Sequence, residues 1–167
     1  MGPSMKRDHG EQSSTADRSI EDFISREGER VRRVLVAQYG PEVGEEAWAD
    51  TAEYCWENWD RLQLMRNPAG YAYRVGRSSA RKYTRWNRRR VFNPHDFADV
   101  ASEGTPMFEF LDRVSRLTPV QRSCLILVHG HGWTYREVAE ILGLSETAVT
   151  NHVARGLQRA RLKVTPK

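Results

Sequence analysis

The stretch between Thr134 and Leu157 predicts two short helices joined by a tight turn. Thr134 and Glu137 have the capping-box spacing, in which each side chain accepts a hydrogen bond from the other residue's backbone N–H at a helix start. Gly143 can adopt the left-handed conformation that ends the first helix, and Ser145 can cap the second. This arrangement is a helix-turn-helix, whose second helix enters the major groove in many DNA-binding proteins.

The second helix of this motif has an apolar face and a polar face. Val149, Val153 and Leu157 recur at helical spacing and are predicted to point inward. Asn and Arg on the opposite face can make bidentate contacts with adenine and guanine edges, and basic residues near the helix end suit phosphates. The outward residues are Thr147, Thr150, Asn151, Arg155 and Gln158, with His152 near the edge and Arg159, Arg161 and Lys163 beyond them. The alternative is a helical hairpin with a structural role only.

Helical periodicity and helix-stop signals extend over the rest of the chain, so the predicted fold class is all-α. Gly40-Pro41 and Asn67-Pro68 separate successive helices in the first half. Residues 91–107 lack a helical period and predict a flexible linker between two small helical domains. The predicted segments are a disordered tail (1–18), a first domain (19–90), the linker (91–107) and a second domain (108–167), with helices at 19–39, 42–62, 68–90, 108–116, 119–128, 135–142 and 146–163.

Charged residues are arranged in alternating blocks along the chain. Residues 41–60 hold seven acidic residues and no Lys or Arg, whereas residues 71–92 hold eight basic residues and no acid. Residues 93–112 are acidic again, and the C-terminal end is basic. Two separated basic blocks favour two contacts with one polyanion, and nucleic acid is the obvious candidate.

The first basic block predicts a ridge of cations on one helix. Arg77, Arg81 and Arg85 recur every four residues, and Tyr83 and Trp86 place aromatic rings among them. This mixture suits a single strand, whose backbone is neutralised and whose bases stack on aromatic rings. For Tyr83 and Trp86 individually, packing in the core is the favoured interpretation.

The composition argues against an enzyme. Cys55 and Cys124 are too few for a disulfide framework or a zinc site, and His129 and His131 lie in a glycine-rich stretch without further ligands. The carboxylates that share a face in residues 46–57 would suit a metal-dependent nuclease, but on one straight helix they do not converge on a point. We therefore predict no catalytic residue, metal or cofactor. The chain shows no apolar run long enough for a membrane span and no secretory signal, so we expect a cytoplasmic protein without membrane insertion.

The two halves together resemble the extracytoplasmic-function (group 4) sigma factors of bacterial RNA polymerase. The segments GEEAWADTAEYCWENWDRL and NPAGYAYRVGRSSARKYTRWNRRR are similar to region 2 of that family, and LTPVQRSCLILVHGHGWTYREVAEILGLSETAVTNHVARGLQRAR is similar to region 4. The resemblance covers about residues 20–90 and 108–163. It implies binding to core RNA polymerase, through its beta and beta-prime subunits, and to promoter DNA.

The resemblance also implies roles for individual residues. Those matching the core-polymerase helix are Glu46, Asp50 and Trp56. Those matching the loop and helix at the minus-10 element are Leu64, Arg66, Asn67, Arg77, Ser78, Arg81, Lys82 and Arg85. Those matching the minus-35 contact are Arg136, Thr147, Thr150, Asn151, His152, Arg155 and Arg159. Family members usually have Gln at Ala49, Asn at Ser78 and a basic residue at Thr150, so the promoter sequence does not follow from these positions.

One further partner and one rival function follow from these resemblances. The family leads us to expect a free monomer that an anti-sigma factor can sequester. The rival is a LuxR-type regulator that binds its own operator, because the second segment also resembles that helix-turn-helix family. A LuxR-type chain would have a sensor or receiver in its first half, and no alternation of strands and helices is visible there.

Overall fold

The computed structural model describes residues 20–86, 92–97 and 102–161, and every regular element in these ranges is helical. The predicted disordered tail, the basic residues 88–90 and Lys163 lie outside them. The N-terminal half contains η1 (Ile24–Gly28), α2 (Glu29–Tyr39), α3 (Pro41–Glu57), α4 (Trp59–Leu62) and α5 (Pro68–Trp86). After η2 (Pro94–Phe97), the C-terminal half contains α6 (Pro106–Ser115), α7 (Pro119–Leu125), η3 (Ile126–Gly130), α8 (Tyr135–Leu142) and α9 (Glu146–Ala160).

The structure confirms most of the helix ends that the sequence predicts. Gly40 adopts a φ of 83° between α2 and α3, a value that glycine accommodates without strain. Asn67 caps α5, because its Oδ1 accepts a hydrogen bond of 2.8 Å from the backbone N–H of Gly70. Thr118 caps α7 in the same way, accepting from the backbone N–H of Gln121 at 3.3 Å.

One expectation from the sequence needs correction. The predicted helix over residues 42–62 is interrupted at Asn58, so α3 and α4 are separate. The buried residues of α3 include Ala47, Thr51 and Cys55, whereas Trp56 is 53% exposed. Small residues suit the buried side of α3 because this helix lies very close to α2.

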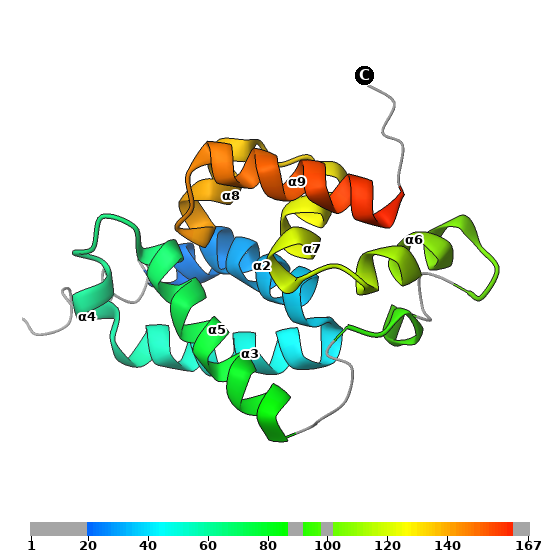
Figure 1. The fold of residues 1–167 in the computed structure, drawn as a ribbon. Coiled ribbons are helices and arrows are strands. Elements are labelled where there is room, and N and C mark those ends of the chain that lie inside the picture. The colour runs from blue at the N-terminus through cyan, green and yellow to red at the C-terminus, as the bar shows by residue number, and fades with distance from the viewer. Residues whose placement is uncertain (1–19, 87–91, 98–101, 162–167) are drawn as a thin grey trace, which may run out of the picture.

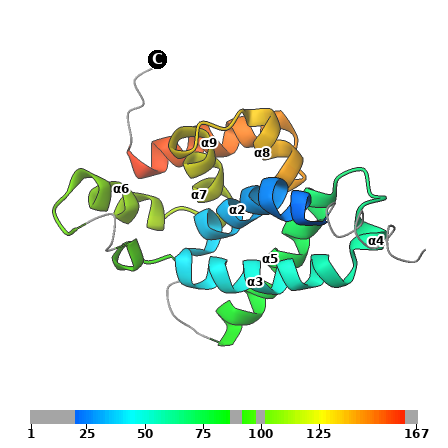
Figure 2. The same cartoon turned by 180° about the vertical axis from the view of Figure 1, so that it is seen from behind.

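Helix α2 lies between the other helices of the N-terminal half and the C-terminal half. In both views, α3 and α5 lie on one side of α2, and α7, α8 and α9 lie on the other (Figures 1 and 2). Val31, Val34 and Leu35 of α2 are completely buried, and the buried residues of both halves form one cluster. The predicted linker also contains packed structure, because Phe92 is buried and η2 follows it. The two predicted domains therefore share a core.

The close approach of α2 and α3 leads to a test of stability. A Cβ added at Gly44 would lie 2.5 Å from the Cα of Val36, whereas one added at Gly130 would meet only a methyl group of Ile126, at 3.7 Å. We expect Gly44→Ala to lower the free energy of unfolding by about 1–3 kcal/mol, because backbone cannot move aside cheaply. Gly130→Ala is the matched control and should be neutral or slightly stabilising. Thermal unfolding of both variants measures the difference, and equal melting temperatures would contradict the proposed close packing.

Candidate nucleic-acid interface

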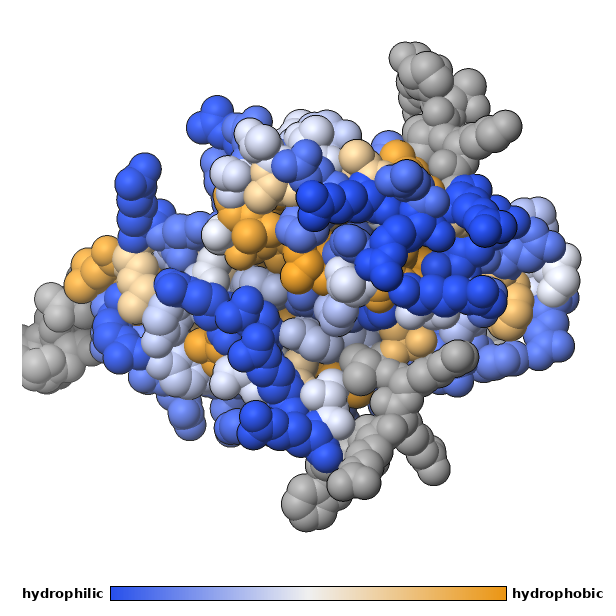
Figure 3. Space-filling view, viewed as in Figure 1, coloured by the Kyte–Doolittle hydropathy of each residue, from blue (hydrophilic) through white to orange (hydrophobic). Residues whose placement is uncertain are grey.

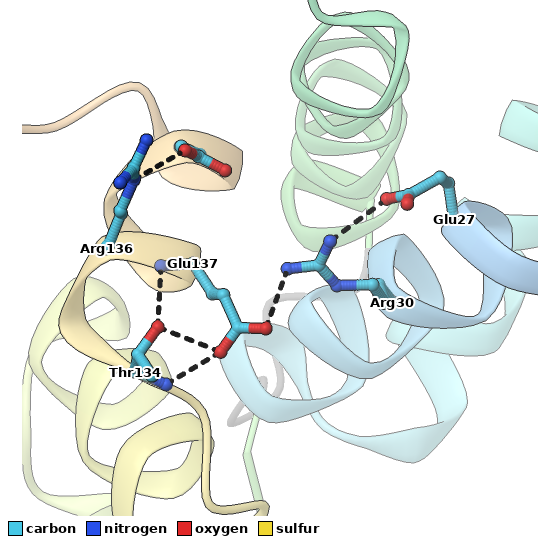
Figure 4. Close-up of polar contacts among 6 residues, drawn as sticks. Glu27, Arg30, Thr134, Arg136 and Glu137 are labelled. Atoms are coloured by element: carbon cyan, nitrogen blue, oxygen red, sulfur yellow. Dashed lines mark hydrogen bonds and ion pairs between the residues drawn. The ribbon is translucent and has the colours of Figure 1, made fainter.

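The helix-turn-helix predicted from the sequence is present in α8 and α9. The backbone N–H of Thr134 donates to Glu137 Oε2 at 2.8 Å, and the backbone N–H of Glu137 donates to Thr134 Oγ1 at 3.2 Å (Figure 4). Gly143 has a φ of 67° and ends α8, and Ser145 Oγ accepts from the backbone N–H of Ala148 at 3.1 Å to start α9. These caps stabilise the start of each helix, because they provide partners for backbone N–H groups that have none within the helix.

The outward face of α9 presents the predicted DNA-contacting residues to solvent. Thr150 is partly engaged with its own helix, since its hydroxyl donates to the carbonyl of Glu146 at 2.9 Å. His152 is half-buried, and in the described part of the chain its Nδ1 has no hydrogen-bond partner. Arg136, at the start of α8, pairs with Glu140 at 3.2 Å. The exposed members of this face are Thr147, Thr150, Asn151, Arg155, Gln158 and Arg159.

A second basic surface follows α5. Hydrophilic residues form a band along this helix and gather over the C-terminal part of α9 above it (Figure 3). Arg77 is half-buried and lies next to α8, since it lines a cavity together with residues 140–143. The exposed members of the α5 surface are Ser78, Arg81, Lys82 and Arg85.

The loop between α4 and α5 presents an apolar side chain to solvent. Leu64 is 85% exposed, and Arg66 beside it is exposed as well. Asn67, at the end of the loop, uses both atoms of its side-chain amide in hydrogen bonds. The Oδ1 caps α5, and the Nδ2 donates to the backbone carbonyl of Glu140 in α8 at 2.9 Å. The loop can therefore offer Leu64 and Arg66 to a ligand without rearrangement, but not Asn67.

Next to this loop lies a group of aromatic and cationic side chains that the sequence prediction missed. The guanidinium groups of Arg61 and Arg74 lie 5.9 and 5.4 Å from the centroid of the Tyr71 ring, and the hydroxyls of Tyr71 and Tyr54 are 3.3 Å apart. Arg74 belongs to the basic block of residues 71–92. Because it lies three residues before Arg77, the sequence could have indicated that both side chains share one face of the helix.

The acidic residues of α3 differ in what they contact. Asp50 accepts hydrogen bonds from the hydroxyls of Ser79 and Tyr83, the second at 3.1 Å, and so joins α3 to α5. The carboxylate also raises the pKa of Tyr83. Glu46 is exposed one turn earlier, and Trp56 lines an apolar depression on the same helix. A charge reversal at Asp50 would therefore disturb the fold as well as any partner.

Contacts between the two halves were not predicted from the sequence. The guanidinium of Arg30 pairs with Glu27 at 3.1 Å and lies 3.9 Å from Glu137 (Figure 4). The same guanidinium lies 4.8 Å from the centroid of the Trp133 ring. Arg122, in α7, is 5% exposed and donates to the carbonyl of Gln38 in α2 at 2.7 Å.

The described residues give no indication of a metal centre or a membrane span. No three His, Cys, Asp or Glu side chains within them are grouped as potential metal ligands. No helix in the described ranges combines the length and the hydropathy that crossing a membrane requires.

Comparison with known proteins supports the sequence-based family assignment of the C-terminal half. A model of the family Sigma-70, region 4 matches residues 107–159. A search of curated proteins gives no match. Among solved structures, the chain is similar to the sigma factor RpoE in complex with the anti-sigma factor NepR from Bartonella quintana. The TM-score is 0.58 at 19% sequence identity, over 86% of this chain and 95% of that chain, which shows a shared fold.

The capping box predicts a pH-dependent contribution to stability. The hydrogen bonds from Thr134 lower the pKa of Glu137 below its ordinary value of 4.5, so the ionised carboxylate stabilises the folded state above that pH. This contribution is lost as the pH falls through the lowered pKa. We expect Glu137→Gln to be less stable than the parent at pH 7, by under about 1 kcal/mol because the side chain is nearly half exposed.

Urea unfolding at a series of pH values from 7 downward measures this difference. The stabilities of the parent and Glu137→Gln should converge as the pH falls through the lowered pKa of Glu137, since both then have a neutral side chain at this position. A difference that stays constant with pH would show that Glu137 contributes through packing and not through its charge.

Proposed function

We propose that this chain, whose residues 107–159 form a sigma-70 region 4 domain, acts as a sigma factor of bacterial RNA polymerase. In this proposal it binds core polymerase, recognises the minus-35 and minus-10 elements of a promoter and assists the opening of the DNA between them. The main support is the exposed face of α9 within a helix-turn-helix that matches region 4. A receiver domain alternates strands and helices, whereas every regular element in the described N-terminal half is a helix. The structure therefore gives no support to a LuxR-type regulator with a receiver domain.

We propose that α9 contacts the minus-35 element as duplex DNA. Asn151 and Arg155 lie on the exposed face and have the side chains that bind base edges bidentately in the major groove. Arg159, two turns beyond Asn151, is exposed and suits a phosphate contact. Arg136, at the start of α8, lies where the first helix of such a motif crosses the DNA backbone.

The loop and the α5 surface are suited to the melted minus-10 element. An extruded base needs an apolar surface that is accessible without rearrangement, and Leu64 meets that condition. Arg81, Lys82 and Arg85 are exposed towards the other end of α5, where their charges suit the phosphates of a single strand. Linking this weak site to the minus-35 contact in one chain raises the effective concentration of each for the other.

Core polymerase is the proposed partner of the exposed side of α3. Glu46 and Trp56 are both exposed on α3. Tryptophan is enriched at the centres of protein interfaces, and an exposed carboxylate suits their polar rim. The solved structure of RpoE contains an anti-sigma factor, and we propose that this chain also has such a partner. The proposed location is the cytoplasm, where the polymerase acts.

Binding to core polymerase is the first test of this function. We expect the parent chain to co-elute stoichiometrically with purified core polymerase, and Glu46→Lys to bind at least about tenfold more weakly because a reversed charge opposes the complementary surface. Glu45→Lys is the matched control: it makes the same change of charge on the same helix, at a residue that pairs with Arg32. Equal losses from both variants would indicate a general charge effect, and no co-elution of the parent would reject the sigma-factor proposal.

A second test separates base contacts from phosphate contacts on α9. We expect Arg159→Ala to weaken promoter binding by the holoenzyme equally on every minus-35 sequence. The slope of the logarithm of the binding constant against the logarithm of the salt concentration should fall in magnitude by about one. The holoenzyme binds the preferred minus-35 sequence with a more favourable free energy than a mutated one. Arg155→Ala should reduce this difference in binding free energy by about 1–3 kcal/mol. Fluorescence anisotropy over a range of salt concentrations measures both. The same response from both variants would contradict the assignment.

A further inference from the structure

We propose that the ends of α6 and α9 form a binding site for a linear oligophosphate, a chain of joined phosphate groups that is either free or part of a nucleotide. In both views, α6 and the C-terminal end of α9 lie side by side (Figures 1 and 2). The site is a hollow within the C-terminal half, and its existence does not depend on the proposed function. The residues that line it are Asp112, Arg113, Arg116, Arg159, Ala160 and Arg161.

Four exposed arginines from two helices far apart in the sequence surround this hollow. Its volume is about 670 Å³, which is within the range of small-molecule sites. A guanidinium is planar and can donate two parallel hydrogen bonds to one phosphate. Several guanidiniums around one hollow can therefore bind phosphates that are joined to each other.

The positive charge of the hollow exceeds what the surrounding structure neutralises. Among the described residues that line it, Asp112 is the single carboxylate, and it pairs with Arg116 at 2.9 Å. Both α6 and α9 end here, and a helix C-terminus is equivalent to about half a negative charge. The two helix ends and Asp112 together offset about two of the four positive charges. An anion with two or more charges would complete the balance.

The partners of the α6 arginines in the free chain are weak and can be exchanged. Arg113 pairs with Glu109 at 3.9 Å. This pair and the one between Arg116 and Asp112 join solvent-accessible side chains four residues apart on the same helix, and pairs of this kind contribute little to stability. A phosphate accepts stronger hydrogen bonds from a guanidinium, so it can replace these partners at little cost.

Arg161 has a backbone conformation that glycine would adopt more easily. It follows the last residue of α9 with a φ of 53°, and it is the one non-glycine residue with a positive φ in the described ranges. A side chain in this left-handed region destabilises the folded state, and such strain is concentrated at functional sites. An arginine here therefore indicates a function for its side chain, and its place in the lining points to phosphate binding.

The hollow is distinct from the face of α9 proposed to bind the minus-35 element. Asn151, Arg155 and Arg159 recur every four residues and share that face, so Arg159 is the residue that the two surfaces have in common. The phosphates of a duplex lie on a convex surface and are separated by sugars, whereas joined phosphates can enter a hollow together. The arrangement of arginines from two helices around one hollow thus favours an oligophosphate over a DNA backbone.

Isothermal titration calorimetry of the full-length chain with inorganic tripolyphosphate tests the site. We expect saturable binding by the parent, and Arg113→Ala and Arg116→Ala should each weaken it by about fivefold, because each removes a charged donor. Arg33→Ala is the matched control: it removes the same charge from an exposed arginine that pairs, like Arg113, with a glutamate four residues before it. An equal loss in the control, or no saturable binding by the parent, would overturn the proposal.

Two further probes distinguish the possible ligands. If adenosine triphosphate binds more tightly than tripolyphosphate and Arg113→Ala weakens both, the ligand is a nucleotide. If it binds equally or more weakly, the ligand is a free oligophosphate. Duplex DNA is the third probe: if Arg113→Ala weakens DNA binding but leaves tripolyphosphate binding unchanged, the hollow contacts a DNA backbone and the proposal is wrong.

Arg161→Gly separates binding from stability. This variant should raise the melting temperature by about 2–4 °C, because glycine adopts the left-handed conformation without strain. It should also weaken tripolyphosphate binding by about fivefold, since it removes one of the four guanidiniums. Calorimetry measures both quantities. A variant that binds tripolyphosphate as tightly as the parent would contradict the assignment of Arg161 to the site.

A consequence for DNA rests on the proposed function, because both ligands would use Arg159. Tripolyphosphate should weaken promoter binding by the parent holoenzyme more than sodium chloride of equal ionic strength does, and Arg113→Ala should need about fivefold more of it. Equal sensitivity of parent and variant would overturn this link. If the parent does not bind core polymerase, the proposed function fails, while calorimetry still decides whether the hollow binds an oligophosphate.

Discussion

The burial of α2 on both sides determines where every other element lies. Leu35 is completely buried, and its side chain lies so close to Gly76 of α5 that a Cβ there would meet it at 2.6 Å. On the same helix, the backbone around Val36 meets Gly44 of α3 just as closely. With α3 and α5 fixed by these close approaches, the other side of α2 is left to α7, and the positions of α8 and α9 follow from α7.

The charged and polar groups at the ends of α2 complement this apolar packing. A helix between two layers has unpaired carbonyls at its C-terminus that water cannot easily reach, and Arg122 satisfies one of them at Gln38. Hydrogen bonds from a charged donor contribute about 1.5–3 kcal/mol each, which helps to offset the cost of burying the guanidinium. The other carbonyls that Arg122 binds, those of Val114, Ser115 and Leu117, belong to the C-terminal half, so this one side chain links the end of α2 to the end of α6.

Several residues proposed for binding also have a structural contact, and this limits what a mutation there can show. Asp50 joins α3 to α5 through Ser79 and Tyr83, whereas Glu46 on the same helix is exposed and has no such contact among the described residues. Asn67 caps α5 while it binds α8. A variant that loses binding identifies a contact with a partner only where the mutated side chain makes no hydrogen bond within the folded chain.

The sequence by itself determined the helices and the DNA-binding motif, because these depend on residues three or four positions apart. The capping box at Thr134, the left-handed Gly143 and the cap at Asn67 could all be predicted from such spacings. The tertiary structure decided the rest: that Trp56 is exposed while Thr51 is buried, and that Asn67 binds a carbonyl 73 residues away. The physical reason is that a cap is satisfied within one turn of its own helix, whereas the partner of a side chain across a core depends on how closely two helices approach.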